Sequence, residues 1–238
     1  KLFSIIAHDL RGPIGAFINL TEMFMDDNNV MTNEEMIEIG RGMNKSAISL
    51  HGLLDNLLHW SRIQREEVVI NKTDIYIKAL AAEVIEIYKP IITKKSLHVN
   101  NIIPEDLIVL ADSNMIQMVL RNLVSNALKF TPKGGAVLIS AVVNSDQIVS
   151  IHVRDNGIGI PAQMIEQLYN FSQSTGRIGT DGEPTSGLGL KLCKEFVERN
   201  GGSLHVISNV EESGVNEENT GKGTDFYFTL PGRKELRH

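Results

Sequence analysis

Residues 136–153, AVLISAVVNSDQIVSIHV, contain two apolar, β-branched runs that a short polar stretch separates. Each run has the length and composition of a β-strand, so the segment predicts two strands in direct succession. Several strands that follow one another without a helix between them do not fit strict β-α-β alternation. The sequence therefore favours an α+β two-layer sandwich over a doubly wound parallel sheet.

The other expected elements lie on both sides of this segment, from about residue 67 onward. Helices are expected at Ile77–Ile92, Ser113–Leu128, Ala162–Tyr169 and Leu188–Arg199, and strands at Val68–Ile70, Leu97–Ile103, Ala136–Val143, Ile148–Val153, Leu204–Ile207 and Asp225–Leu230. Two polar stretches, 172–186 and 211–221, are expected to be loops.

The first 66 residues have a different pattern, in which apolar residues recur at steps of three and four. This pattern predicts two long helices with a coiled-coil-like seam. The polar stretch 26–29 separates them, and Thr32 with Glu35 has the spacing of a capping box. Because two helices alone form a thin core, we expect two copies to form a four-helix bundle, rather than packing of the hairpin on its own second domain. The expected domains are 1–66 and 67–238.

Composition excludes several classes of protein. Of 238 residues, 42% are hydrophobic and 22% are charged, which is ordinary for a globular protein and not for a disordered chain. A net charge of −6 disfavours general binding of nucleic acid. The single cysteine, Cys193, allows no internal disulfide and points to a reducing compartment. No apolar run reaches the roughly 20 residues of a membrane span, and a start at Lys1 without Met suggests a piece of a longer protein.

His8 is the first candidate for chemistry. In the heptad pattern it takes an outward position beside Asp9, with Gly12 one turn further along the same face. A carboxylate beside an imidazole can fix its tautomer and raise the nucleophilicity of the other nitrogen. Pro13 lacks an N–H group and leaves the carbonyl of Asp9 without its helical donor. Taken alone, this pair is most simply an inert surface pair. The other internal histidines are expected to be structural or exposed: His51, His59, His98, His152 and His205.

Two glycine-rich turns are the next candidates. Residues 155–159, DNGIG, follow a strand, and residues 187–190, GLGL, open a helix. Glycine allows the backbone to approach a ligand, and a helix N-terminus presents free N–H groups to phosphate. The chain has no GxxxxGK(S/T) motif, and the surroundings of Gly157 and Gly159 fit a dinucleotide-binding fingerprint badly.

Asn122, Asn126 and Lys129 share one stripe of the helix expected at 113–128 and its extension. Two amides and an ammonium group on one stripe would suit a magnesium ion and phosphate oxygens. A polar solvated face is the simpler alternative for these residues, although asparagine is a poor helix former.

These pieces, in this order, resemble the catalytic core of the sensor histidine kinases of two-component signalling. FSIIAHDLRGP (3–13) resembles the H box, NLVSNALKFTP (122–132) the N box, DNGIGIP (155–161) the G1 box and TSGLGL (185–190) the G2 box. The resemblance covers nearly the whole chain. It implies a HisKA-type dimerisation and phosphotransfer hairpin, followed by a GHKL-type ATP-binding domain with the Bergerat fold.

The resemblance also implies roles for individual residues. His8 would accept the phosphoryl group from ATP, and Asp9 would orient or deprotonate it. Asn126 would coordinate Mg²⁺, and Asp155 would accept a hydrogen bond from the adenine amino group. The remaining nucleotide-binding residues would be Asn122, Lys129, Gly157, Gly159, Gly187, Leu188, Gly189 and, near the adenine, Thr224, with 172–186 as the ATP lid.

The implied partners are a second copy of the chain, bound through residues 1–66, and the receiver domain of a response regulator. A membrane anchor is expected only in segments outside this chain, which places this portion in the cytoplasm. The sequence departs from the family at Gly12, where Thr or Asn is usual and serves dephosphorylation of the partner. It also departs at Thr185, where Gly is usual, and around Phe171, where the F box is degraded.

Three other functions are alternatives on this sequence. A GHKL-superfamily ATPase without histidine phosphotransfer would share Asn126, Asp155 and the glycine turns, but it would not need His8. A dimerising scaffold with an inactive nucleotide site would not bind ATP. Autophosphorylation and nucleotide binding separate these two from a kinase. The third alternative is a dedicated phosphatase, which Gly12 disfavours.

Overall fold

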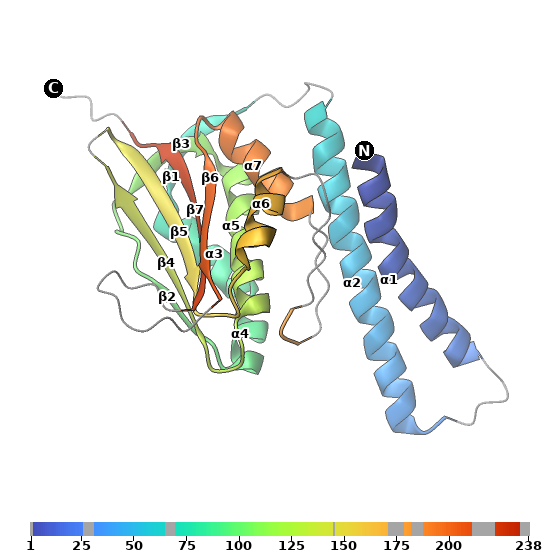
Figure 1. Ribbon diagram of the computed structural model, residues 1–238. Coiled ribbons are helices and arrows are strands. Elements are labelled where there is room, and N and C mark those ends of the chain that lie inside the picture. The colour runs from blue at the N-terminus through green and yellow to red at the C-terminus, as the bar shows by residue number, and fades with distance from the viewer. Residues whose placement is uncertain are drawn as a thin grey trace. The chain divides into compact units, whose positions relative to one another are not determined.

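The computed structural model describes residues 2–25, 31–64, 70–144, 146–170, 179–181, 188–210 and 222–233; at 2–9, over much of the second helix and at a few other helical positions, only the backbone is described. Contacts divide the chain into two compact units, Lys1–Val68 and Val69–His238. Within the first unit Figure 1 shows two long helices, and within the second it shows a sheet with helices on one face.

The first unit consists of helices α1 (Leu2–Met25) and α2 (Asn33–Gln64), which pack against each other. Gly42 of α2 lies against the side chain of Leu20 on α1, so closely that a Cβ atom at Gly42 would fall 2.8 Å from Leu20 Cδ1. Pro13 lies inside α1. In the described residues of both units, no helix is long and apolar enough to cross a membrane.

The capping box at the start of α2 is confirmed. The backbone N–H of Thr32 donates to Glu35 Oε2 at 2.8 Å, and the N–H of Glu35 donates to Thr32 Oγ1 at 3.3 Å. The hydrogen bond from the Thr32 backbone lowers the pKa of Glu35 below its usual value. The two residues thus satisfy N–H groups that have no partner within the helix.

The second unit is a two-layer sandwich. Its main sheet has the order β2-β4-β5-β7-β6, in which β2 and β4 are parallel and all other neighbours are antiparallel. The strands are β2 (His98–Asn101), β4 (Ala136–Val143), β5 (Ile148–Asp155), β6 (Leu204–Asn209) and β7 (Gly223–Pro231). The succession of β4 and β5 confirms the prediction that strands follow one another here without a helix.

Helices cover one face of this sheet (Figure 1). They are α3 (Ile77–Ile87), α5 (Ser113–Phe130) and α7 (Leu188–Arg199), accompanied by the shorter α4 (Lys89–Lys95) and α6 (Ala162–Asn170). The apolar face of α5 is the centre of the core, because eight of its side chains are buried. Its flanks carry the polar residues that the sequence singled out.

The structure differs from the expected local elements at two places, and a third expectation is tested at one residue only. The strands β1 (Lys72–Tyr76) and β3 (Ile108–Asp112), which pair with each other, were not predicted, because both are short and lie beside charged residues. The strand expected at 68–70 is absent at Ile70; its first two residues lie outside the described part. The helix expected at 77–92 ends at Ile87, and Pro90 lies in the first turn of the new helix α4. Proline is favoured in the first turn of a helix, because the N–H group that it lacks would have no partner within the helix there.

Buried and less buried side chains alternate along β5, and this alternation places a polar residue at the end of the helix-covered face of the sheet. Val149, Ile151 and Val153 are buried and face the helices, and the same alternation makes Asp155 the next residue on that face. On β7 the partner of Asp155 in the register is Thr224, which is also buried. The helix-covered face of the sheet therefore ends in two polar residues on neighbouring strands.

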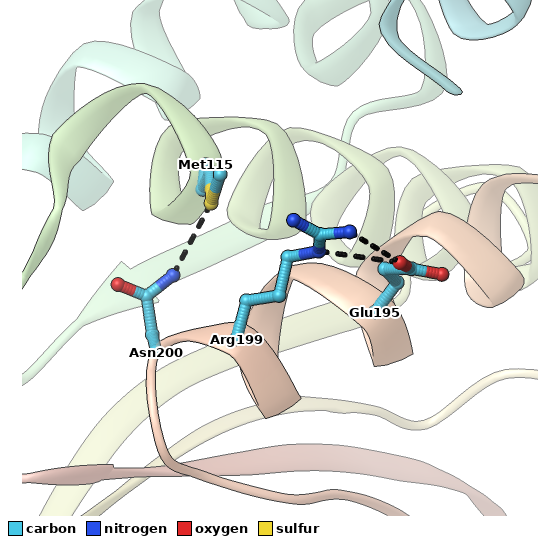
Figure 2. A network of polar contacts seen from close by, with 4 residues as sticks. All are labelled: Met115, Glu195, Arg199 and Asn200. Atoms are coloured by element: carbon cyan, nitrogen blue, oxygen red, sulfur yellow. Dashed lines mark hydrogen bonds and ion pairs between the residues drawn. The ribbon is translucent and has the colours of Figure 1, made fainter. Parts of the chain in front are cut away.

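A buried asparagine joins the other end of α5 to α7 (Figure 2). The side chain of Asn200 is fully buried, accepts from Asp112 N at 2.8 Å, and donates to the Phe196 carbonyl at 2.8 Å and to Met115 Sδ at 3.5 Å. Asp112 is the N-cap of α5, and its Oδ1 accepts from Met115 N. One side chain thus connects the start of α5 with the end of α7.

We expect Asn200→Ala to lower the free energy of unfolding by about 1–3 kcal/mol, because it leaves the buried Asp112 N–H without an acceptor. Urea denaturation of the two chains measures the difference. Asn100→Ala, at an exposed position of β2, is the matched control and is expected to change it by less than about 0.5 kcal/mol. Equal losses in both variants would contradict this role of Asn200.

Candidate functional site

Asp155 lies at the centre of the candidate site. It is 6% exposed, and its Oδ1 accepts two backbone hydrogen bonds, from Gly157 N at 2.8 Å and from Thr224 N at 3.3 Å. Among the described residues no hydrogen bond reaches the other oxygen, Oδ2. The carboxylate is therefore held by one oxygen, and the second is available for a donor that comes from a ligand.

Burial raises the pKa of Asp155 from 3.8 to about 6, and the nearby charge of Asp225 acts in the same direction. The two backbone N–H groups oppose this effect because they stabilise the ionised form. A carboxyl group with such a pKa is mostly ionised at pH 7 but becomes protonated under mildly acidic conditions. As a carboxylate, it prefers a ligand group that donates a hydrogen bond.

Glycines allow the backbone to close around Asp155. A Cβ atom at Gly157 would overlap the carbonyl oxygen of Phe130, the last residue of α5, and this carbonyl accepts from Ile158 N at 3.1 Å. Gly159 has a φ of +68°, which disfavours other residues, and a Cβ there would overlap the backbone of Asn209. The turn after β5 is therefore packed directly on the end of α5 and on β6.

Thr224 belongs to a small hydroxyl cluster beside Asp155. Its Oγ1 lies 2.9 Å from Ser208 Oγ, and Ser208 Oγ also contacts the Gly223 carbonyl at 2.7 Å and accepts from Ile160 N at 2.8 Å. Ser208 thus connects β6 and β7 with the turn that begins at Asp155. No local pattern pointed to Ser208, because a serine near the end of a strand is an ordinary residue.

The amide stripe of α5 is present as expected. Asn126 Nδ2 donates to Asn122 Oδ1 at 3.2 Å. Within the part of the chain that the structure describes, no hydrogen bond reaches the amide oxygen of Asn126. Gly189 of α7 lies so close to the amide of Asn122 that a Cβ atom would overlap it. Lys129, one turn further along α5, is half-buried. The structure thereby brings together residues of the N box and the start of the G2 helix.

An amide oxygen without a donor is a suitable ligand for a hard cation such as Mg²⁺, which prefers oxygen and usually keeps several waters and phosphate oxygens. No group of three or more His, Cys, Asp or Glu in the described ranges could hold a metal ion.

Several predicted site residues are described only partly or not at all. His8 and Asp9 lie in α1, in the other unit, and their side chains are outside the description. Gly187 lies outside the described residues, as do Thr185 and Phe171, and of Leu188 only its place as the first residue of α7 is described. Of the expected lid, 172–186, only residues 179–181 are described.

One polar group of this domain, Lys95, was missed from the sequence, and the partners of another, His152, were not predicted. Lys95 is 3% exposed and donates to the Thr180 hydroxyl, although it follows another lysine and resembles a solvated charge in the sequence. His152, expected to be structural or exposed, contacts Asp225 Oδ2 through Nδ1 at 3.0 Å and stacks on Tyr227. These contacts join residues distant in sequence, so no local pattern could reveal them.

The family comparison matches residues 111–234, which is about half of the chain, to the histidine kinase-, DNA gyrase B- and HSP90-like ATPase family. The chain belongs to this ATPase family. The match covers Asn122, Asn126, Asp155 and Thr224, so the resemblance of the second domain to a GHKL-type ATP-binding core is confirmed at the family level.

Several proteins that resemble the chain over most of its length are named as sensory kinases. The adaptive-response sensory kinase SasA of Crocosphaera subtropica is 28% identical over 97% of this chain and 59% of its own length. The sensor histidine kinase WalK of Bacillus subtilis is 32% identical over 77% of this chain and 28% of its own length. The chain thus spans less than two thirds of these relatives.

Solved structures agree with the fold. The histidine kinase AdeS of Acinetobacter baumannii has a TM-score of 0.70 and 18% identity, over 95% of this chain and 98% of that one. Histidine kinase ThkA, solved in complex with the response regulator TrrA, also has a TM-score of 0.70, at 24% identity over 99% of this chain and 62% of that one. At these identities the likeness is one of fold.

Asp155 is expected to make stability pH-dependent. Its pKa in the folded chain lies above the unfolded value of 3.8, so the folded chain binds more protons between about pH 4 and 6. The free energy of unfolding therefore falls through this range as the pH rises. Asp155→Asn cannot ionise, so its stability relative to the wild type should increase by about 2–3 kcal/mol between pH 4 and 7.

Urea denaturation of both chains at pH 4, 5, 6 and 7 measures this difference. Asp106→Asn, at an exposed position, controls for the loss of one carboxylate elsewhere. A difference between Asp155→Asn and the wild type that does not vary with pH would contradict a raised pKa for Asp155.

Proposed function

We propose that the chain is the catalytic core of a sensor histidine kinase, which transfers the γ-phosphoryl group of ATP to His8 and from there to an aspartate of a response regulator. The observation that carries the proposal is the buried Asp155 carboxylate, in a turn that packs on the end of the helix that bears the amide stripe, inside a domain that belongs to the ATPase family. Named sensor kinases that resemble nearly the full chain support the same assignment.

In this proposal residues 67–238 bind the nucleotide. The free Oδ2 of Asp155 accepts a hydrogen bond from the adenine amino group, with Thr224 beside it. Gly157 and Gly159 give the ring close access to the backbone. Phosphates lie toward Asn122, Lys129 and the start of α7, at Gly187, Leu188 and Gly189, where free helix N–H groups favour anions.

Asn126 is the proposed protein ligand of Mg²⁺, through its amide oxygen. The ion would supply neutralisation of phosphate charge, which is the main requirement of phosphoryl transfer. Lys129 contributes positive charge on the same stripe of the helix. The protein itself therefore provides orientation and charge, and little covalent chemistry is needed from this domain.

His8, in the proposed phosphotransfer domain 1–66, is the acceptor. A lone pair on one imidazole nitrogen attacks the γ-phosphorus, the bond from phosphorus to the bridging oxygen of ADP breaks, and ADP leaves with that electron pair. The phosphorylated ring gives up its remaining N–H proton, for which Asp9 is the neighbouring base. The phosphoryl group then passes to a carboxylate oxygen of the partner, and the imidazole ring takes a proton back and returns to its neutral form.

A homodimer through residues 1–66 is part of the proposal. Several large apolar side chains of the first unit are 40–55% exposed: Ile14, Ile18, Met36 and Ile37. Burial of such side chains stabilises helix bundles, and a second copy would provide the missing surface. A response regulator is the proposed partner because ThkA, which shares the fold, was solved with one. The membrane anchor is proposed to lie in segments outside this chain, with this portion in the cytoplasm.

Autophosphorylation tests the proposal directly. The full 238-residue chain is incubated with Mg²⁺ and ATP labelled at the γ-phosphate, beside His8→Ala and the control His98→Ala, which changes an exposed histidine of β2. We expect an acid-labile, base-stable label that His8→Ala loses and His98→Ala keeps.

The alternatives give different results in the same assay. Hydrolysis of ATP without protein labelling, unchanged in His8→Ala, would replace the proposal with an ATPase that has no phosphotransfer. A chain that neither binds nucleotide nor becomes labelled would be a scaffold. Either outcome would contradict the proposal that the chain is the catalytic core of a histidine kinase.

Gly12 leads to a separate prediction about the reverse reaction. It has no polar side chain one turn from His8, and a Cβ atom there would meet no other atom within 4 Å, so a larger residue is tolerated. We expect Gly12→Thr to raise the dephosphorylation rate of a response regulator that the chain has phosphorylated by roughly tenfold, the value of one good hydrogen bond. Gly12→Ala, which adds no hydroxyl, is the control. An unchanged dephosphorylation rate in Gly12→Thr would contradict a role of position 12 in dephosphorylation of the partner.

A further inference from the structure

Lys95 holds a buried positive charge in the second unit. It is the last residue of α4 and is 3% exposed, whereas Lys94 beside it is exposed. Its ammonium group donates to the carbonyls of Leu128 at 2.9 Å and Lys129 at 3.3 Å, and to Thr180 Oγ1 at 2.8 Å. The carbonyls belong to the last turn of α5, whose negative dipole end favours a cation.

Thr180 also forms hydrogen bonds to carbonyl groups at the end of α5. Its backbone N–H donates to the Lys129 carbonyl at 3.0 Å. Its hydroxyl group lies 2.9 Å from the same carbonyl and 3.2 Å from the carbonyl of Thr131. Residues 179–181 are thereby attached to the end of α5 by backbone and side chain together.

The carbonyl of Lys129 is the point where these contacts meet. Lys95 Nζ, Thr180 N and Thr180 Oγ1 all lie within 3.3 Å of it. Lys129 itself is the basic residue of the amide stripe, one turn beyond Asn126. The contacts therefore hold the backbone of Lys129, whose side chain is proposed to meet the phosphates. Lys95 makes its contacts from α4, an element that otherwise lies outside the site.

We propose that Lys95 and Thr180 are positioning residues that hold Lys129 and residues 179–181 in place for the phosphates of bound ATP. This inference rests on the proposed nucleotide site. Neither residue needs to touch the nucleotide. Their effect is on the phosphate end of the site, because the adenine end depends on Asp155 and Thr224, which make no described contact with Lys95 or Thr180.

Binding of a series of nucleotides separates this role from a general loss of structure. Titration calorimetry of the full chain with ATP, ADP and AMP, in the presence of Mg²⁺, gives one dissociation constant for each. For Lys95→Met we expect ATP affinity to fall about tenfold, the value of a hydrogen bond to a charged group. The affinity of Lys95→Met for AMP, which lacks the outer phosphates, should differ from that of the wild type by less than about twofold. Lys94→Met removes the same charge at an exposed position and should leave all three constants unchanged.

Thr180 provides a second test that leaves the buried lysine in place. Thr180→Val removes the hydroxyl at nearly constant volume and is expected to weaken ATP binding in the same selective way. Thr180→Ser keeps the hydroxyl and should retain the affinity of the wild type. The double variant Lys95→Met/Thr180→Val should lose less than the product of the two single losses, because both act through one contact.

The outcomes distinguish this inference from the proposed function. Equal losses for ATP and AMP, or an unchanged ATP affinity in both Lys95→Met and Thr180→Val, would overturn the positioning role and leave the nucleotide site standing. A wild-type chain that binds none of the three nucleotides would overturn the proposed function, and this inference with it.

Discussion

The hydrogen bonds from Gly157 N and Thr224 N to one oxygen of the buried Asp155 carboxylate are the constraint on which the site depends. They require β5 and β7 to be paired in register, and they require a turn after β5 that only glycine allows to pack on the end of α5. Burial at this position destabilises the charged form of Asp155 and therefore raises its pKa. A ligand that donates a hydrogen bond to Oδ2 would compensate part of that cost, so binding and local stability are linked.

Helix α5 connects the two ends of the second unit. At its start, Asp112 and the buried Asn200 join it to the end of α7. At its end, Lys95 and Thr180 hold the carbonyls of its last turn. The apolar face between these points is buried against the sheet, so the polar stripe on its flank lies on a rigid support. Rigid placement of charge and amide groups is what phosphoryl transfer requires from a protein.

Local pattern predicted much of this fold. The bounds of β4 and α7 agree with the runs read from the sequence, because β-branched runs and a 3.6-residue period are strong local signals. The short strands β1 and β3 were missed, since each is stable only when paired with the other. The amide stripe and the glycine turns were found from residue types and spacing. The contacts of Lys95 with Thr180 and of Asp112 with Asn200 were not found, because they join residues 85 and 88 positions apart.

A crystal structure of the chain with ADP and Mg²⁺ would show whether Asp155 binds the adenine. We expect the adenine amino nitrogen within about 2.7–3.2 Å of Asp155 Oδ2, while Oδ1 keeps its bonds to Gly157 N and Thr224 N. We also expect the magnesium ion on the amide oxygen of Asn126. A nucleotide bound away from Asp155, or an adenine that leaves Oδ2 without a donor, would rule out this role of Asp155.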